Sequence, residues 1–311
     1  MTVTPSFAEI PARVRLVEVG PRDGLQNEAG IVPTDVKAEF VRLLVGAGLR
    51  TIEVTSFVNP RWIPALADAT ELALKLPKAE GVRYAALVPN KQGYERFRQT
   101  ALDMPAVFMS ASEGHNKKNI NKSIAETFPV LKEVVDLARA DGKPVRGYVS
   151  VVFGCPYEGA VDPKNVLRVV KTMLEWNVDE ISLGDTIGVA TPRQVTEMLA
   201  MLFAAGVPRE RLALHFHDTR GTALANYLAG LQMGVSVLDT SVGSLGGCPY
   251  APGAAGNAAS EDLVFMLHGM GVDTGIDLTK LSEAGGFIGR ALGKRLPGKY
   301  QQAFQAAAAK A

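Results

Sequence analysis

Short apolar stretches alternate regularly with longer segments of helical period along this sequence. The short stretches are rich in β-branched residues and apolar on both faces, which is typical of strands buried in a parallel sheet. Several of the longer segments begin with a Thr, Ser or Asp cap. The predicted strands are 15–20, 51–57, 82–88, 106–111, 147–153, 180–185, 212–218 and 237–242, and predicted helices between them include 34–48, 162–176 and 191–206.

Eight strand–helix units without a polar linker predict a closed (β/α)₈ TIM barrel. An open doubly wound sheet is the alternative, but no G-x-G-x-x-G motif follows the first strand. The 311 residues suit one such barrel as well as they suit two domains. We therefore expect a single domain over 1–311, with 272–311 as a helical C-terminal extension.

Charge and hydropathy narrow the choice of partners and compartment. The formal net charge is +1, which favours neither nucleic acid nor an anionic membrane as a partner. No apolar run approaches the ~20 residues that cross a bilayer, and the first residues lack the pattern of a secretory signal or an organellar presequence. A cytoplasmic protein is expected, with its two cysteines as free thiols.

Polar residues follow five of the predicted strands. In a TIM barrel the strands' carboxyl ends meet at one mouth, where catalytic groups gather. Side chains from five separate strands are therefore expected to face the same opening. The segments are GPRDGLQNE (20–28), EVTSFVNP (53–60), SLGDTIG (182–188), HFHDTRG (215–221) and SLGGCPYAPGAAGN (244–257).

The HFHD stretch is the most informative of these segments. Residues two apart on a strand point the same way, so His215 and His217 should face the lumen while Phe216 packs outward. Two imidazoles at a barrel mouth make half of a metal site, and Asp and Asn candidates lie at nearby strand ends. The alternative is a pair of hydrogen-bonded structural histidines. His115 and His268 are expected to be surface or packing residues.

Arg22 and Asp23 directly follow the first predicted strand, in a turn that Gly20 and Gly24 permit. Such neighbours are usually a solvated charge pair. At the mouth, however, Asp23 could supply a hard oxygen ligand and Arg22 could stabilise a developing oxyanion. Glu53, on the lumen side of the second strand, could hold Arg22 or form a merely structural ion pair with it.

The only two cysteines occur in repeated GCPY segments, at Cys155 and Cys248. Cys248 lies in a glycine-rich stretch that lacks the Lys-Ser/Thr ending of a phosphate-binding loop. We interpret this stretch as a lid that carries Cys248 over the mouth, with Asn257 at its far end able to complete a metal shell. Cys155 is expected to be a packing residue or to support the site residues from behind.

Seven segments together closely resemble the hydroxymethylglutaryl-CoA lyase family. The resemblance runs in order from about residue 14 to 290. The broader group is a metal-dependent barrel superfamily with isopropylmalate and homocitrate synthases and biotin-dependent carboxyltransferases. The segments are VEVGPRDGLQNE (17–28), IEVTSFVNP (52–60), SASEGHNKKNIN (110–121), GCPYEG (154–159), ISLGDTIGVATP (181–192), HFHDTRG (215–221) and SVGSLGGCPYAPGAAGN (241–257).

The resemblance implies retro-Claisen cleavage of 3-hydroxy-3-methylglutaryl-CoA to acetoacetate and acetyl-CoA. It implies a divalent cation, Mg²⁺ or Mn²⁺, held by Asp23, His215, His217 and Asn257. Arg22 would be the essential arginine and Cys248 the proton-transferring thiol, with Glu53 and Asp185 as supporting acids. The general base could be Asp23, His215 or a metal-bound water. Three residues differ from the family pattern: Ala29, Ser244 and Pro252.

An acyl-CoA substrate implies a binding site near the mouth. Gln26 is a candidate contact, and Lys117, Lys118 and Asn119, after the fourth strand, could bind the CoA phosphates or pantetheine. A solvated basic loop explains the lysines equally well. A homodimer acting in leucine degradation is expected.

Four alternatives stay open at this point. They are a lyase for a longer branched 3-hydroxyacyl-CoA, a Claisen-type condensing synthase, a carboxyltransferase and a barrel with a purely structural metal. The condensing relatives usually carry a further C-terminal region. The carboxyltransferases use a modified lysine that has no counterpart in SLGDTIG.

Overall fold

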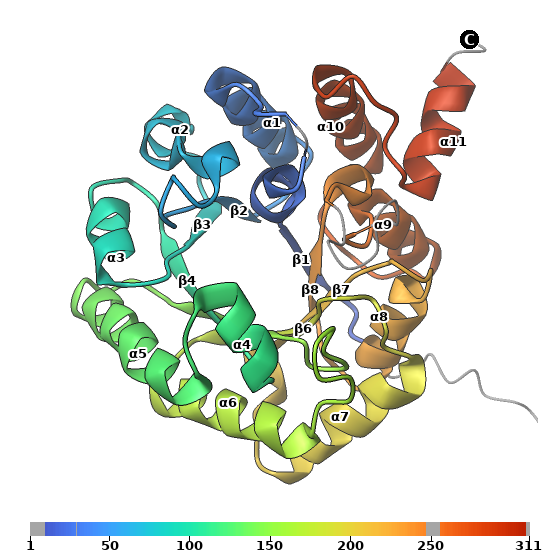
Figure 1. Cartoon of the computed structure of the whole chain (residues 1–311). Coiled ribbons are helices and arrows are strands. Elements are labelled where there is room, and N and C mark those ends of the chain that lie inside the picture. The colour runs from blue at the N-terminus through green and yellow to red at the C-terminus, as the bar shows by residue number, and fades with distance from the viewer. Residues whose placement is uncertain (1–9, 29, 247–255, 309–311) are drawn as a thin grey trace, which may run out of the picture.

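The structure, a computed structural model of the whole chain, describes residues 10–28, 30–246 and 256–308 (Figure 1). Eight parallel strands pair in sequence order, and the last pairs with the first to close a barrel. The predicted TIM barrel is thereby confirmed. The strands are β1 (Arg15–Glu18), β2 (Thr51–Ser56), β3 (Arg83–Leu87), β4 (Met104–Ser110), β5 (Arg146–Ser150), β6 (Glu180–Asp185), β7 (Leu212–Phe216) and β8 (Val237–Thr240).

Helices surround the barrel, as Figure 1 shows. Capping residues in the sequence determine where several helices begin. Asp162 caps α6 by accepting from the backbone N–H of Lys164, and Thr191 and Gln194 form a capping box at α7. The helices predicted over 34–48, 162–176 and 191–206 are confirmed as α1, α6 and α7. The helices are α1 (Thr34–Gly46), α2 (Ala69–Lys75), α3 (Lys91–Arg98), α4 (Glu113–Ile120), α5 (Ile124–Ala140), α6 (Pro163–Glu175), α7 (Pro192–Ala204), α8 (Ala223–Gln232), α9 (Ser260–Gly269), α10 (Leu278–Ala291) and α11 (Lys299–Ala308).

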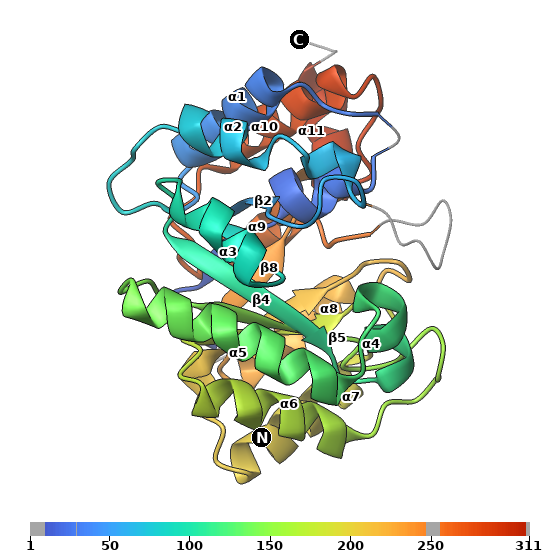
Figure 2. The same cartoon turned by 60° about the vertical axis from the view of Figure 1, so that its left-hand side comes forward.

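Helix α10 lies beside α1 and also contacts α9 and α11, as Figure 2 shows from the side. Its inner face buries Leu281, Ala284 and Ile288. Gly48 has a φ of +103°, and a Cβ there would collide with the carbonyl oxygen of Gly275, just before α10. We propose that residues 1–311 form a single domain, with 272–311 as its helical extension. Among the described helices, none is long and apolar enough to cross a membrane.

The interior of the barrel holds charged side chains where aliphatic layers are usual. Arg146 on β5 and Asp239 on β8 are both fully buried and form an ion pair across the lumen. Glu180 on β6 pairs with Arg146 at 2.9 Å and with Arg15 on β1. A small apolar cluster of Val17, Val19, Ala213 and Val237 fills part of the remaining space. These charges lie below the mouth to which the candidate site opens.

Candidate metal centre and active site

A cavity of about 880 Å³ contains most of the predicted site residues at the carboxyl ends of the strands. Arg22, Asp23, His215 and His217 line it, and Gln26 also contributes to its wall. This volume is in the range of pockets that hold a cofactor or a drug-sized ligand. Four of the five polar segments, those after β1, β2, β6 and β7, contribute residues to this one cavity, as predicted.

Arg22 and Asp23 are placed by η1 (Gly20–Gly24), a short turn that follows β1. The backbone N–H groups of Arg22 and Asp23 donate to the carbonyl of Val19 at 3.1 and 2.7 Å. The buried Glu18 carboxylate accepts from the N–H of Gly20 at 2.9 Å. It also accepts from the N–H of Val242, at the start of η4 (Val242–Ser244) after β8. Glu18 thus ties together the turns that follow the first and the last strand.

Arg22 is held between two carboxylates. Its Nε donates to Oε1 of Glu53, and its Nη1 donates to Oδ1 of Asp23 at 2.6 Å. Burial by itself lowers the pKa of Arg22, but the charges of Glu53 and Asp23 outweigh it and raise that pKa. The guanidinium is therefore a permanent cation at the cavity wall. Oε2 of Glu53 is buried and has no hydrogen-bond partner among the described residues.

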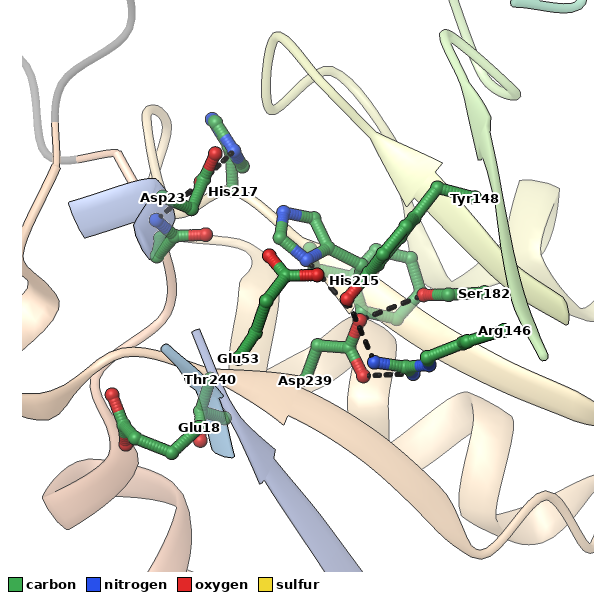
Figure 3. A network of polar contacts seen from close by, with 12 residues as sticks. Glu18, Asp23, Glu53, Arg146, Tyr148, Ser182, His215, His217, Asp239 and Thr240 are labelled. Atoms are coloured by element: carbon green, nitrogen blue, oxygen red, sulfur yellow. Dashed lines mark hydrogen bonds and ion pairs between the residues drawn. The ribbon is translucent and has the colours of Figure 1, made fainter. Parts of the chain in front are cut away.

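The two histidines and Asp23 form a compact cluster. Their ligand atoms all lie within 4.8 Å of one another, and the two imidazole rings are 5.3 Å apart between centroids. Nε2 of His217 lies 4.0 Å from Oδ2 of Asp23. Phe216, between the histidines, packs outward against Tyr227 of α8, as the period-2 pattern predicts. Figure 3 shows His215, His217 and Asp23 turned toward one another.

Asn257 joins this cluster through its backbone and its side chain. It lies opposite His217 in an antiparallel bridge, and its Nδ2 donates to Oδ2 of Asp23 at 2.8 Å and to the carbonyl of Leu245 at 3.1 Å. The buried Oδ1 of Asn257 has no hydrogen-bond partner in the part of the chain that the structure describes. That oxygen is the atom with which an asparagine would bind a cation.

The electrostatics of the cluster suit a divalent cation. Burial raises the pKa of Asp23, but the charges of Arg22 and of the two histidines outweigh this effect and lower the pKa well below its usual value. Burial and the charge of His215 lower the pKa of His217 to about 4. Asp23 is therefore a carboxylate and His217 a neutral imidazole, and metal ligands must be deprotonated in this way. Asp, His and Asn donors together fit Mg²⁺, Mn²⁺ or Zn²⁺.

Asp239, directly below His215, does not stand out in the sequence. The two residues are register partners on β7 and β8, and Nδ1 of His215 lies 3.5 Å from Oδ2 of Asp239. Ser182 donates to that same oxygen at 2.8 Å, and Arg146 donates to Oδ1 at 2.5 Å. The sequence gives one indication of this contact, a charged aspartate in the mostly apolar strand β8. The predicted strand 147–153 begins one residue after Arg146. The sequence therefore did not place Arg146 in the barrel as the partner of Asp239.

Some predicted site residues lie elsewhere. Asp185 is buried and accepts from the backbone N–H groups of Val189 and Ala190 at 3.0 and 2.9 Å, so its carboxylate shapes the loop after β6. Lys118 is exposed on α4 and is not among the residues that line the cavity, whereas Asn119 is. Ser244 donates to the carbonyl of Asn257 at 2.5 Å. Cys248, Ala29 and Pro252 lie outside the described residues.

The remaining cysteine and histidines have identifiable surroundings. Cys155 is buried, and its Sγ accepts from the hydroxyl of Ser112 at 3.0 Å, in keeping with a packing residue. His115 is buried on α4 with Nδ1 2.6 Å from Oγ of Ser110, and it also lines the cavity, which its polar sequence context did not reveal. Nε2 of His268 lies 2.8 Å from Oγ1 of Thr274, remote from the cavity lining.

Fold and site together define a (β/α)₈ barrel with a cluster of cation ligands at the carboxyl ends of its strands. The family model described as HMGL-like matches residues 13–288, so the chain belongs to the HMGL-like family. It is 51% identical over 300 residues to the mitochondrial hydroxymethylglutaryl-CoA lyase of Bos taurus, covering 96% of this chain and 92% of the relative. A cytoplasmic 3-hydroxy-3-methylglutaryl-CoA lyase of Danio rerio is 50% identical over 295 residues, 95% of this chain and 88% of the relative.

The chain is also similar to solved structures of HMG-CoA lyases. The crystal structure of the Bacillus subtilis HMG-CoA lyase has a TM-score of 0.94 and 50% identity, covering 95% of this chain and 99% of its own. An HMG-CoA lyase from Acinetobacter baumannii, solved in complex with coenzyme A and 3-methylmalate, has a TM-score of 0.89 and 36% identity, with 97% of each chain covered.

Proposed function

We propose that this protein is a carbon–carbon lyase that cleaves 3-hydroxy-3-methylglutaryl-CoA to acetoacetate and acetyl-CoA with a divalent cation. The observation that carries the proposal is the cluster of Asp23, His215 and His217 beside the buried Arg22, on the wall of one cavity. The names of the relatives, at about 50% identity over most of the chain, support the substrate. The coenzyme A bound to the Acinetobacter relative supports an acyl-CoA.

The cation would be held by Asp23, His215, His217 and Asn257. When bound there, it would orient the substrate and lower the pKa of the 3-hydroxyl group that must lose its proton. Mg²⁺ or Mn²⁺ is our proposal for its identity, because a carboxylate and an amide oxygen are hard donors. Oδ1 of Asn257, which has no hydrogen-bond partner among the described residues, and the neutral ring of His217 support this ligand set.

Arg22 would stabilise the negative charge that develops on the thioester oxygen of the leaving acetyl group. A fixed, permanently charged donor in a site that excludes water is typically worth ~3 kcal/mol to such a transition state. The contacts of Arg22 with Glu53 and Asp23 fix its position before substrate binds, so no ordering is required during the reaction. Glu53 would contribute by holding the guanidinium of Arg22 in position. Asp185 would act only by shaping the loop after β6.

Cys248 would donate a proton to the carbanion carbon of the leaving group. This assignment comes from the sequence, because Cys248 lies outside the described residues. The described residues on either side of 247–255 support it. A Cβ on Gly246 would lie 3.0 Å from Nδ2 of Asn257, and the carbonyl of Gly256 accepts from the N–H of Asp218 at 2.7 Å. The described residues next to 247–255, Gly246 and Gly256, therefore both lie close to the proposed cation ligands.

Substrate contacts are proposed for Arg22, Gln26 and Asn119, which line the cavity, and for the exposed Lys118, which precedes Asn119 on α4. We also propose a cytoplasmic homodimer that acts in leucine degradation. Light scattering of the purified protein tests the dimer. Since relatives of similar identity are named both cytoplasmic and mitochondrial, the compartment needs localisation of the tagged protein in its own cells.

Cleavage of the proposed substrate is directly measurable. Purified protein is treated with a chelator, freed of it and mixed with 3-hydroxy-3-methylglutaryl-CoA, and acetoacetate and acetyl-CoA are measured as Mg²⁺ or Mn²⁺ is added. We expect both products in equal amounts and only with the cation. No release with either cation would overturn the proposal. Thioesters with longer branched 3-hydroxyacyl groups, tested in parallel, would show whether a different acyl group is preferred.

A further inference from the structure

We propose that Asp239, itself fixed by Arg146 and Ser182, positions the ring of His215 and thereby sets the affinity of the protein for its divalent cation. This inference rests on the proposed cation site, but not on the identity of the substrate. It concerns residues below the cavity, since neither Asp239 nor Arg146 is among the residues that line it.

Strand register brings Asp239 and His215 together. The two residues are Cα partners on the neighbouring strands β7 and β8, so both side chains enter the lumen at the same level. Nδ1 of His215 lies 3.5 Å from Oδ2 of Asp239. Figure 3 shows one ring nitrogen of His215 toward Asp239 and the other toward Asp23 and His217. The ring thus connects a buried carboxylate to the ligand cluster.

A carboxylate in this place selects the histidine tautomer that can bind a metal. It favours the proton on Nδ1, so that the lone pair of Nε2 faces the cluster. It also limits rotation of the ring. Carboxylate, imidazole and cation in a row are a common arrangement in metalloproteins, and loss of the carboxylate typically weakens metal binding 10–100-fold.

Asp239 can do this because it has no freedom of its own. Its Oδ2 accepts from the hydroxyl of Ser182 at 2.8 Å, and its Oδ1 accepts from Nη2 of Arg146 at 2.5 Å. Arg146 is oriented in turn by the hydroxyl of Tyr148, which accepts from Nη1 at 2.9 Å, and by Glu180. Residues on β5 and β6 therefore fix the Asp239 carboxylate of β8 under a single ligand on β7.

The test is titration of the metal-free protein with Mn²⁺, with free Mn²⁺ followed by electron paramagnetic resonance. Asp239→Asn keeps the shape of the side chain and removes its charge. We expect its Kd for Mn²⁺ to rise about 10–100-fold. Asp68→Asn is the matched control, because it removes a carboxylate from another largely buried ion pair, Lys37–Asp68, which has no contact with Asp239, Arg146 or His215. Its Kd should stay within about twofold of wild type.

A second variant and a double substitution separate positioning from a general loss of structure. Ser182→Ala removes one hydrogen bond to Asp239 without changing charge, so Mn²⁺ binding should weaken about fivefold, the usual effect of one such bond. In a His215→Ala background, Asp239→Asn should cause no further loss, since its effect passes through the ring. Circular dichroism shows which variants are folded.

Three results would overturn the inference. They are wild-type Mn²⁺ affinity in folded Asp239→Asn, an equal loss in Asp68→Asn, and additive losses in the double substitution. If Asp239→Asn does not fold, unchanged binding by Ser182→Ala has the same consequence. Because these measurements use no substrate, a wild-type protein that binds Mn²⁺ but releases no acetoacetate would refute the proposed reaction and leave this inference standing.

Discussion

Arg22 and Glu53 form an ion pair that is almost closed to solvent, with side chains 9% and 0% exposed. Nε of Arg22 donates to Oε1 of Glu53, which joins the turn after β1 to the inner face of β2. Because Nη1 is held by Asp23 as well, the guanidinium is fixed along two of its edges. Its orientation in the cavity is thus part of the fold and does not depend on substrate.

Loss of the Glu53 carboxylate should therefore impair turnover more than substrate binding. We expect Glu53→Ala to lower kcat about 10²-fold with little change in KM, and Arg22→Gln to lower it about 10²–10³-fold, as when a transition-state donor is removed. Arg42→Gln, which breaks the exposed pair with Glu39, is the control and should leave both constants unchanged. Steady-state acetoacetate release measures these effects, and wild-type kcat in Glu53→Ala would refute this role.

The two cysteines should respond differently to the same substitution. Cys248→Ala is expected to lower turnover about 10²–10⁴-fold, the usual contribution of a general acid. Cys155→Ala removes a buried thiol that accepts a hydrogen bond from Ser112, so it should affect stability and leave turnover nearly unchanged. Product release by the two variants at saturating Mg²⁺ is the measurement. Similar losses in both would contradict the assignment of Cys248.

Glu261 should make the folded protein less stable as pH rises. Burial raises the pKa of its carboxyl group to about 8, although the N–H of Gly243 donates to Oε2 and opposes the shift. The unfolded chain loses this proton near pH 4.5. Between these values unfolding releases a proton, so the free energy of unfolding should fall with pH and level off above about 8. Urea unfolding at pH 5, 6.5 and 8 measures the slope.

Glu261→Gln should flatten that slope and raise stability at pH 8. Oε1 of Glu261 and Oε1 of Gln301 are both buried, and both lie within about 3 Å of the point that a Cβ on Gly285 would occupy. An amide at position 261 could donate to Gln301 at every pH. Exposed Glu283 on α10 is the matched control, and Glu283→Gln should keep the wild-type slope. Part of the slope will persist, because burial also raises the pKa of Glu18 to about 7.

Two glycines at the end of α1 should respond in opposite ways to alanine. Gly48→Ala places a Cβ at a φ of +103° and against the carbonyl oxygen of Gly275, so it should lower the free energy of unfolding by about 3 kcal/mol or more. Gly46, the last residue of the helix, has no atom within 4 Å of an added Cβ. Gly46→Ala should stabilise by up to about 1 kcal/mol. Denaturant unfolding compares the two, and equal effects would contradict this account of α10 packing.

The fold was predictable because its signal is local and repeated. Each strand is a short apolar run and each helix has its own period, so eight modest indications agreed on one closed barrel. The HFHD stretch predicted its own geometry, because residues two apart on a strand share a face. Asp23 and Arg22 could be placed because they immediately follow a strand, and in a barrel that position is the mouth.

The buried contacts were not predictable in the same way. Arg146 and Asp239 are 93 residues apart in sequence and meet across the lumen, which no local pattern encodes. A one-residue error at the start of β5 was enough to leave Arg146 outside the predicted strand. His115 was hidden for another reason: its polar surroundings resemble a surface loop, whereas α4 covers the cavity with one face and meets solvent with the other.

The charged interior also limits how robust this barrel can be. The buried Arg146, Glu180 and Asp239 and the partly exposed Arg15 carry charges that sum to zero, but a buried ion pair is often no more stabilising than apolar side chains of the same size. We expect a version with leucine or methionine at all four positions to melt at a higher temperature and to bind Mn²⁺ weakly. Directed evolution for heat resistance alone would therefore tend to replace these charged residues with apolar ones and to yield a stable barrel without cation binding.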